Sequence, residues 1–235
     1  MAWDTQRTKK LLLDAAIEEF AAKGPEAARV AQIATRAGVN KERIYQYFGN
    51  KDGLFRAVLA SELSKLAEAV PLAGEAAADL GDYTARVFDY HRQNPHFLRL
   101  LAWEGLHRGP APTAAAGTAP AGTPPESLPG AAPGAVAAEG APEGMPKVAS
   151  EVVSEGERTE HYARKVAAIG AAQDAGNVTG EVPADHLMYA VIALTAGWFN
   201  LPQLVQMVAP ATAAAEPEAQ REAVAALVRR LASRP

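Results

Sequence analysis

Apolar residues in the N-terminal quarter of the chain recur at helical spacing and predict several short helices. Residues 5–23 carry one apolar stripe, and this segment ends at Gly24. Residues 30–37 and 41–48 carry two further short patterns, which Gly38 separates. A glycine at this point permits the left-handed backbone that a sharp turn between two helices needs. The pattern therefore predicts two short helices joined by a tight turn.

The second of these helices has a narrow apolar arc and a broad polar face. Ile44 and Phe48 fall together around the helix, whereas Arg43 and Gln46 fall on the opposite side. Arginine and glutamine side chains can pair with base edges in the major groove of DNA. The pattern favours a helix-turn-helix that binds DNA. The alternative is an amphipathic helical hairpin with solvated charges.

Another helix is expected to begin directly after this one, with Asn50 as its capping residue. Lys51 stands in its first turn, where a cation is unfavourable beside the positive end of the helix dipole. An anion bound there would offset this cost. Backbone N–H groups and Lys51 together would then hold a DNA phosphate beside the reading helix.

These residues resemble the TetR-type bacterial transcriptional regulators. The resemblance covers residues 7–59 and rests on LLLDAAIEEFAAKG (11–24), VAQIATRAGV (30–39), the run of Tyr45, Tyr47 and Phe48, and NKDGLF (50–55). One position departs from the family pattern, because Arg29 stands where the family usually has a capping Ser or Thr. The candidate DNA contacts are Arg29, Lys41, Arg43, Tyr45, Gln46, Tyr47 and Lys51.

The predicted fold class is all-α, with an N-terminal three-helix DNA-binding domain of the helix-turn-helix type and a larger helical ligand-binding and dimerisation bundle. We expect residues 1–50 to form the first domain and residues 51–235 the second. Residues 109–146 are mostly Ala, Pro, Gly and Thr with few large apolar side chains. Such a composition cannot offset the entropy of ordering, so we interpret this segment as a flexible insertion between helices.

Two late segments, residues 187–198 and 224–231, carry apolar side chains at the spacing of a helix–helix seam. The family resemblance implies that the last two helices form a two-fold homodimer. The expected interface residues are Leu187, Val191, Leu194, Trp198, Val224, Leu227, Val228 and Leu231. The resemblance also implies a pocket for a small organic ligand between the helices. Its aromatic candidates are Phe97, Trp103, Tyr162, Tyr189 and Trp198.

The charge is unevenly distributed, which supports a DNA-facing N-terminal part. Through residue 60 there are ten Lys and Arg side chains against seven Asp and Glu, a net charge of +3. The remainder carries thirteen against twenty, a net charge of -7. The chain has no cysteine, which excludes disulfides and thiolate metal sites. Acidic residues follow the N-terminal leucines too soon for a signal peptide, so we expect a cytoplasmic protein.

Enzyme chemistry finds no support in the residue pattern. The sequence has no G-x-S-x-G, no H-E-x-x-H and no Gly-rich phosphate loop, so neither a catalytic role, a metal nor a cofactor is expected. The leading interpretation is a homodimeric repressor that a small ligand releases from a two-fold DNA operator. One alternative is a helical small-molecule carrier or enzyme in which the N-terminal helices only scaffold. Another is a nonspecific DNA-architectural protein.

Overall fold

The computed structural model describes residues 2–108 and 155–234, and every element within these ranges is helical. The N-terminal elements are α1 (Ala2–Ala27), α2 (Val30–Ala37), α3 (Glu42–Phe48) and α4 (Lys51–Ala69). They are followed by a short 3-10 helix η1 (Gly74–Ala77), α5 (Leu80–Gln93), α6 (Pro95–Arg108), α7 (Glu155–Asp174), α8 (Ala184–Asn200), α9 (Pro202–Val208), α10 (Pro210–Ala213) and α11 (Pro217–Ala232). The predicted all-α fold class is confirmed. The proposed insertion at 109–146 lies outside the described residues.

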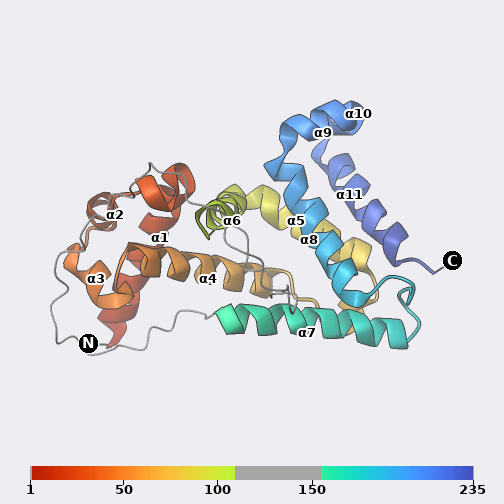
Figure 1. The fold of residues 1–235 in the computed structure, drawn as a ribbon, viewed down its shortest axis with the longest axis horizontal. Helices are drawn as coiled ribbons and strands as arrows, with labels where there is room; N and C mark the ends of the chain where they lie inside the picture. Colours follow the sequence, from red (N-terminus) through yellow and green to blue (C-terminus); the bar gives the residue numbers. More distant parts are fainter. Residues whose placement is uncertain (1, 109–154, 235) are drawn as a thin grey trace, which may run out of the picture.

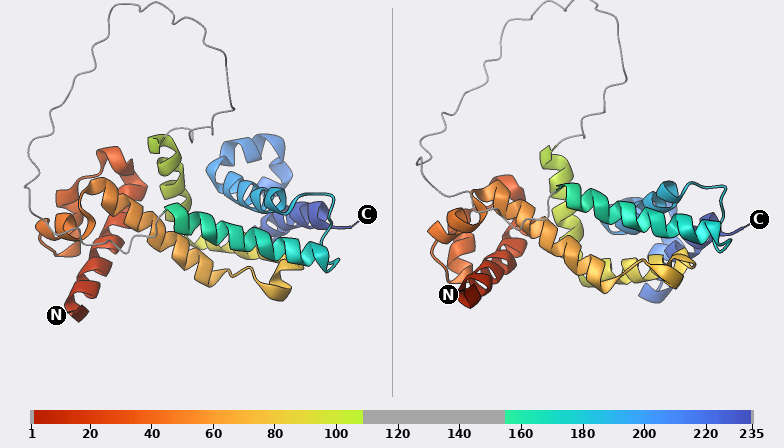
Figure 2. Two further views of the ribbon diagram at one scale, coloured as in Figure 1. Left: turned by 60° about the horizontal axis from the view of Figure 1, so that its bottom comes forward. Right: turned by 90° about the horizontal axis from the view of Figure 1, so that it is seen from below.

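The helices form two packed groups that α4 connects. α1, α2 and α3 gather at one end of the molecule, and α4 runs from them toward the larger group made by α5, α7, α8 and α11 (Figure 1). α7 begins beside α4 in both views of Figure 2. Two helices therefore link the helix-turn-helix to the larger bundle: α4, and α6, which contacts both α1 and α8.

The N-terminal group has its own apolar core. Phe20 of α1, Ile33 of α2 and Ile44 of α3 are each fully buried in it. The rings of Phe20 and Phe55 meet edge to face, with their centroids 5.1 Å apart. Leu100 of α6 belongs to the same buried cluster. The core of the DNA-binding end therefore extends past residue 50 into α4 and α6.

A second core lies in the larger group and takes up several residues expected at a dimer interface. Leu187, Val191 and Val228 are completely buried within the single chain, and Val224 is 2% exposed. The reason is that α5 packs against both α8 and α11 and covers their apolar stripes. These four positions therefore belong to the interior of the protomer.

The other four expected interface residues keep exposed surface. Leu194 and Trp198 are half-buried, while Leu227 and Leu231 are 55% and 44% exposed. α9 and α10, which the apolar pattern did not predict as separate helices, follow α8 after a bend of 96°. Within the described ranges no single helix is long and apolar enough to cross a membrane, and only the bent pair of α8 and α9 passes that test by length and composition.

Candidate nucleic-acid interface

The turn between α2 and α3 has the geometry that the sequence predicted. Gly38 ends α2 with φ 65° and ψ 29°, in the left-handed region. Its N–H donates to the Thr35 carbonyl at 3.2 Å, and the next N–H, of Val39, donates to the Ala34 carbonyl at 3.0 Å. Ala34 is 4% exposed. Its small side chain lets the two helices approach, so that Ile44 anchors α3 from below.

The outward face of α3 is polar and free of large apolar side chains other than Tyr45. Lys41, Arg43 and Gln46 are exposed, and Tyr45 is 44% exposed. The Arg43 guanidinium donates from Nη1 to Gln46 Oε1 at 2.8 Å. This bond aligns two side chains that can each pair with a base edge. The structure thus brings four of the seven predicted DNA contacts to one exposed surface.

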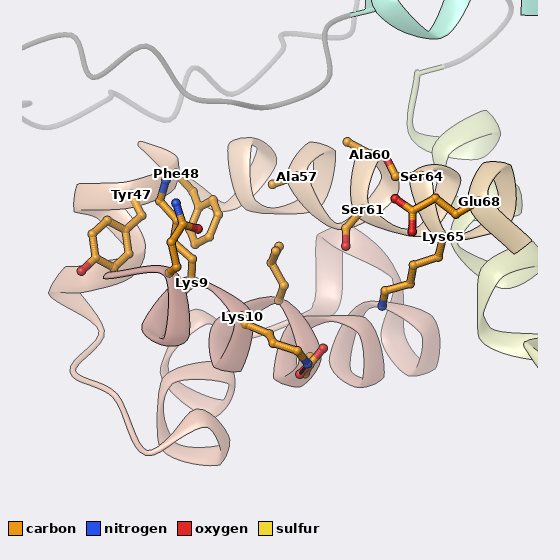
Figure 3. Close-up of a pocket in the computed structure, with 13 residues that line it drawn as sticks. Lys9, Lys10, Tyr47, Phe48, Ala57, Ala60, Ser61, Ser64, Lys65 and Glu68 are labelled. Atoms are coloured by element: carbon orange, nitrogen blue, oxygen red, sulfur yellow. Dashed lines mark hydrogen bonds and ion pairs between the residues drawn. The ribbon is translucent and has the colours of Figure 1, made fainter. Parts of the chain in front are cut away.

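Tyr47 turns away from that surface toward α1. Its ring packs edge to face on Phe48, and Lys9 Nζ lies 6.0 Å from the ring centroid. Both aromatic residues line a cleft of about 420 Å³ between α1 and α4, along which Lys10 and Lys65 also lie (Figure 3). Acidic residues, Asp14 and Glu68, line the same cleft, and Lys10 pairs with Asp14 at 2.7 Å. Tyr47 therefore borders the α1 flank of the helix-turn-helix and not the outward face of α3.

Lys51 is held by the backbone at the end of α1. Its ammonium donates to the Glu26 carbonyl oxygen at 2.9 Å, which leaves two of its three N–H donors for another partner. Asn50 caps α4 as predicted, because its Oδ1 accepts the Gly53 N–H at 2.7 Å. Lys51 therefore lies beside the capped first turn of α4, and its contact with a DNA phosphate stays a prediction.

Gly53 is a residue of this site that the sequence pattern did not single out. A Cβ at this position would overlap the carbonyl oxygen of Phe48. The absence of a side chain lets the start of α4 pack directly on the end of α3. The NKDGLF run contained a signal for it, since a glycine inside the first turn of a helix is unfavourable unless another backbone approaches it.

Arg29 stands at the N-terminus of α2 in extended conformation, and its side chain makes no capping bond. A buried carboxylate instead holds the backbone of Arg29 itself at the start of α2. Glu19 of α1 is 3% exposed and accepts the Arg29 N–H at 3.3 Å and the Lys23 ammonium at 2.8 Å. Burial alone would raise the pKa of Glu19, but the bonds from Lys23 and Arg29 together hold that pKa below its ordinary value. Glu19 thus anchors α2, and the Arg29 side chain remains exposed.

The aromatic residues expected to line a ligand pocket are dispersed. Phe97 of α6 and Tyr162 of α7 border one internal cavity, which α4, α5 and α8 also line. Tyr189 is 70% exposed on α8, and the Trp198 ring lies 6.1 Å from that of Phe88. Trp103 instead packs on the core of the DNA-binding end. The five predicted residues therefore do not share one pocket.

Trp103 lies against α1, at the point where that helix bends, and not in the internal cavity. Gly24 has φ 76° at a kink in α1, and a Cβ there would lie 2.8 Å from the Trp103 ring. A neighbouring contact joins the same two helices, since His107 Nδ1 lies 2.8 Å from Glu26 Oε1. Trp103 consequently reports on the contact between α1 and α6.

Among the polar residues that line the internal cavity and that the residue pattern did not single out are His91 and Lys165. They are 4% and 6% exposed. A signal for Lys165 existed in its spacing, because it lies three residues after Tyr162 and four before the buried Ile169, on one face of α7. His91 follows Val87 and Phe88 on α5 at the same spacing.

Comparison with known proteins identifies the family. A model described as bacterial regulatory proteins, tetR family, matches residues 12–58, and one described as tetracyclin repressor-like, C-terminal domain, matches residues 79–123 and 145–230. The chain belongs to the TetR family of helix-turn-helix regulators of transcription. Members of this family are DNA-binding regulators and not enzymes.

Individual relatives agree with this assignment. The HTH-type transcriptional repressor SCO4008 of Streptomyces coelicolor is 34% identical over 203 residues, which span 86% of this chain and 84% of that protein. The HTH-type transcriptional repressor NicS of Pseudomonas putida is 35% identical over 112 residues, 46% of this chain and 53% of that protein. Among solved structures, the Streptomyces coelicolor transcriptional regulator SCO4942 shares the fold, with a TM-score of 0.67 at 24% identity over 97% of this chain and 99% of that one.

Proposed function

We propose that this TetR-family protein is a cytoplasmic repressor that binds a two-fold DNA operator as a homodimer and is released from it by a small organic ligand. The observation that carries the proposal is the exposed polar face of α3, where Arg43 and Gln46 are joined at 2.8 Å. Ile44 and the Gly38 turn fix the helix beneath that face. A helix so presented can enter the major groove.

The residues of the interface divide into two groups by their surroundings. Arg43, Gln46 and Tyr45 project from the exposed face of α3 and would contact base edges. Lys51 is held at the start of α4, and Tyr47 lies on the α1 flank, so both would contact phosphates. Base contacts confer sequence preference, whereas phosphate contacts confer affinity that falls with salt.

The dimer would use the apolar surface that remains exposed on the late helices. Leu227 and Leu231 lie one turn apart on α11, and Tyr189 and Ile192 of α8 are also exposed. α8 and α11 contact each other, so both contribute to one region of the molecule. A two-fold axis through this region would present two copies of α3 to successive major grooves.

Ligand release would act through α4. Leu63 and Leu66 of this helix border the internal cavity, and its first turn holds Lys51 and packs on α3. A ligand that favours a shifted position of α4 would change the spacing of the two reading helices. The fraction of protein in the DNA-binding arrangement would then fall, by an amount set by how much more tightly the ligand binds the shifted arrangement.

The experiment compares two single substitutions in α3 and α4. Binding isotherms of Arg43→Ala and Lys51→Ala are measured on a duplex selected from a random pool and on its scrambled version, at several salt concentrations. Arg43→Ala should cost about 1 to 3 kcal/mol on the selected duplex and relax preference at particular base pairs. Lys51→Ala should weaken both duplexes alike and reduce the salt slope by about one.

The matched control is Arg230→Ala, which removes an exposed cation from α11 at the opposite end of the chain. It should leave both isotherms unchanged. The proposed orientation of α3 is wrong if Lys51→Ala alters base preference while Arg43→Ala does not.

A further inference from the structure

The internal cavity is small and mostly apolar. It lies between α4, α5, α7 and α8, has a volume of about 40 Å³, and has aliphatic walls that include Leu63, Val87, Met188 and Ile192. That space holds about three water molecules, which is the size of a group of three heavy atoms. Any ligand in it can bury only one small functional group, so the polar residues of the wall decide which group fits.

Lys165 is the first of these residues. Its ammonium donates to the Tyr83 hydroxyl oxygen at 2.9 Å and lies 5.5 Å from the Tyr83 ring centroid. Burial raises the pKa of that phenol, so Tyr83 is neutral and supplies no countercharge. In the part of the chain that the structure describes, no carboxylate forms an ion pair with Lys165. Burial lowers the pKa of Lys165 to about 8, so at pH 7 most of the charge remains, without an opposite charge.

His91 is the second. Burial lowers its pKa to about 4, so the ring is neutral at pH 7, with one nitrogen as donor and the other as acceptor. The ring stacks on Phe97 at 5.7 Å, and its Nδ1 has no hydrogen-bond partner among the described residues. Buried polar atoms are rarely left unpaired in proteins. An unpaired nitrogen and an unneutralised ammonium therefore border the same small space.

A wider cleft adjoins the cavity. It has a volume of about 330 Å³, lies between α4 and α7, and shares Leu63, His161 and Tyr162 with the cavity. Burial and the neighbouring cations Lys165 and Arg164 lower the pKa of His161. The region therefore carries a positive potential even where its histidines are neutral.

The nearby acidic side chains do not cancel this potential, because most of them already pair with other basic side chains. Glu104 accepts two bonds from Arg158, at 2.7 and 3.1 Å. Glu62 on α4 accepts Lys65 Nζ at 2.6 Å and lies 2.6 Å from His96 Nε2. Glu160, which also lines the outer cleft, is exposed to solvent that screens it.

We propose that this cavity binds the acidic head of an organic anion, with a carboxylate paired to Lys165 and hydrogen-bonded to His91, and with an apolar body that extends into the outer cleft. A carboxylate has three heavy atoms and matches the space available. Its charge supplies the missing partner of Lys165, and its second oxygen can accept Nδ1–H of His91. A cationic ligand would place a like charge beside a buried ammonium. Only the statement that this anion releases the protein from DNA rests on the proposed function.

The test uses three series of probes. Within each series the apolar body is the same and only the head group differs. 4-Phenylbutyrate, octanoate and 2-naphthoate are each compared with the corresponding primary amide and amine. Binding to the full chain without DNA is measured by calorimetry at pH 7. At least one carboxylate should bind ten-fold or more tightly than its amide and amine. The proposal is overturned if no carboxylate exceeds its amide, or if an amine is the tightest member of its series.

Two variants assign the effect to the cavity. Lys165→Met keeps the side-chain length and should reduce carboxylate affinity about ten-fold while leaving the amide unchanged. Arg99→Met removes an exposed cation from α6 that lines neither the cavity nor the outer cleft, and should change carboxylate affinity less than two-fold. Equal losses in both variants would show a general electrostatic effect and would sink the assignment to Lys165.

An independent reading comes from the lysine itself. In protein labelled with ¹³C at lysine Cε, the Lys165 signal should titrate near pH 8 in the free chain, and saturating carboxylate should raise that midpoint by at least one unit. An unchanged midpoint would contradict the proposed ion pair. DNA binding is measured separately on the free chain, so a protein that binds carboxylate but not DNA would disprove the proposed function and leave this site standing.

Discussion

Lys165→Met should make the protein more stable at neutral pH, although it removes a hydrogen bond. The buried ammonium costs folding free energy because its pKa falls from 10.5 in the unfolded chain to about 8. A shift of this size corresponds to about 3 kcal/mol at 1.36 kcal/mol per unit. Losing the bond to the Tyr83 hydroxyl costs about 1 kcal/mol. The net expectation is a gain of about 2 kcal/mol in the free energy of unfolding at pH 7.

The pH dependence gives the sign of the effect independently. The folded state holds the Lys165 proton less tightly than the unfolded state, so below pH 8 both states are protonated and the full cost is present. Between pH 8 and 10.5 the unfolded chain binds more protons, and the stability of the parent protein rises with pH. The advantage of Lys165→Met should therefore shrink by about 1 kcal/mol between pH 7 and pH 9.

The assay is urea unfolding followed by circular dichroism at both pH values, with Arg164→Met as the control on the same helix. Arg164 is exposed, so this change should alter the unfolding free energy by less than about 0.5 kcal/mol. If Lys165→Met is less stable than the parent at pH 7 and their difference does not change with pH, Lys165 is not an uncompensated buried charge. The account of the cavity would then fail.

Three further predictions concern the DNA-binding end and the late helices. Gly53→Ala should destabilise the chain by about 2 kcal/mol and weaken DNA binding, because the added Cβ overlaps the carbonyl oxygen of Phe48. Urea unfolding and DNA-binding isotherms measure the two effects. Unchanged values would show that α3 and α4 do not pack as described. Glu19→Gln should cost about 1 to 2 kcal/mol at pH 7. Because folding lowers the pKa of Glu19, the stability that its carboxylate contributes is present above the unfolded value of 4.5 and is lost as the pH falls. The unfolding free energies of parent and variant should therefore converge in acid. A difference that stays constant with pH would contradict the role assigned to Glu19. Leu227→Lys combined with Leu231→Lys should yield folded monomers by light scattering, whereas Leu106→Lys, at a still more exposed leucine of α6, should leave the mass unchanged. A double variant that stays dimeric would refute the proposed interface.

The helix-turn-helix was predictable because local rules decide it. Gly38 fixes the turn, Asn50 caps the next helix, and the spacing of Ile44 from Phe48 separates the buried arc of α3 from its polar face. Each of these effects depends on residues within one or two turns of each other. The sequence therefore predicted both the segment and its orientation.

Contacts between distant segments were not predictable in the same way. A seam-like spacing in α8 and α11 indicates that something covers the apolar stripe, but it cannot distinguish α5 of the same chain from a second copy. The spacing therefore predicts Leu187 and Val228 at a helix–helix contact, and the structure shows that α5 of the same chain provides such a contact. The bond from the Arg29 N–H to Glu19 and the bond from Lys165 to Tyr83 likewise join residues of different helical segments.

The most direct test of the central claim is selection of bound fragments from a random pool of duplex DNA by the full-length protein. The account predicts enrichment of one motif with two half-sites related by two-fold symmetry and spaced by about one helical turn, 10 to 10.5 base pairs, or a multiple of it. Arg43→Ala should lose preference at the same base pair in both half-sites. A bound pool with no enriched motif, or with a motif that Arg43→Ala selects unchanged, would contradict the claim that α3 reads an operator.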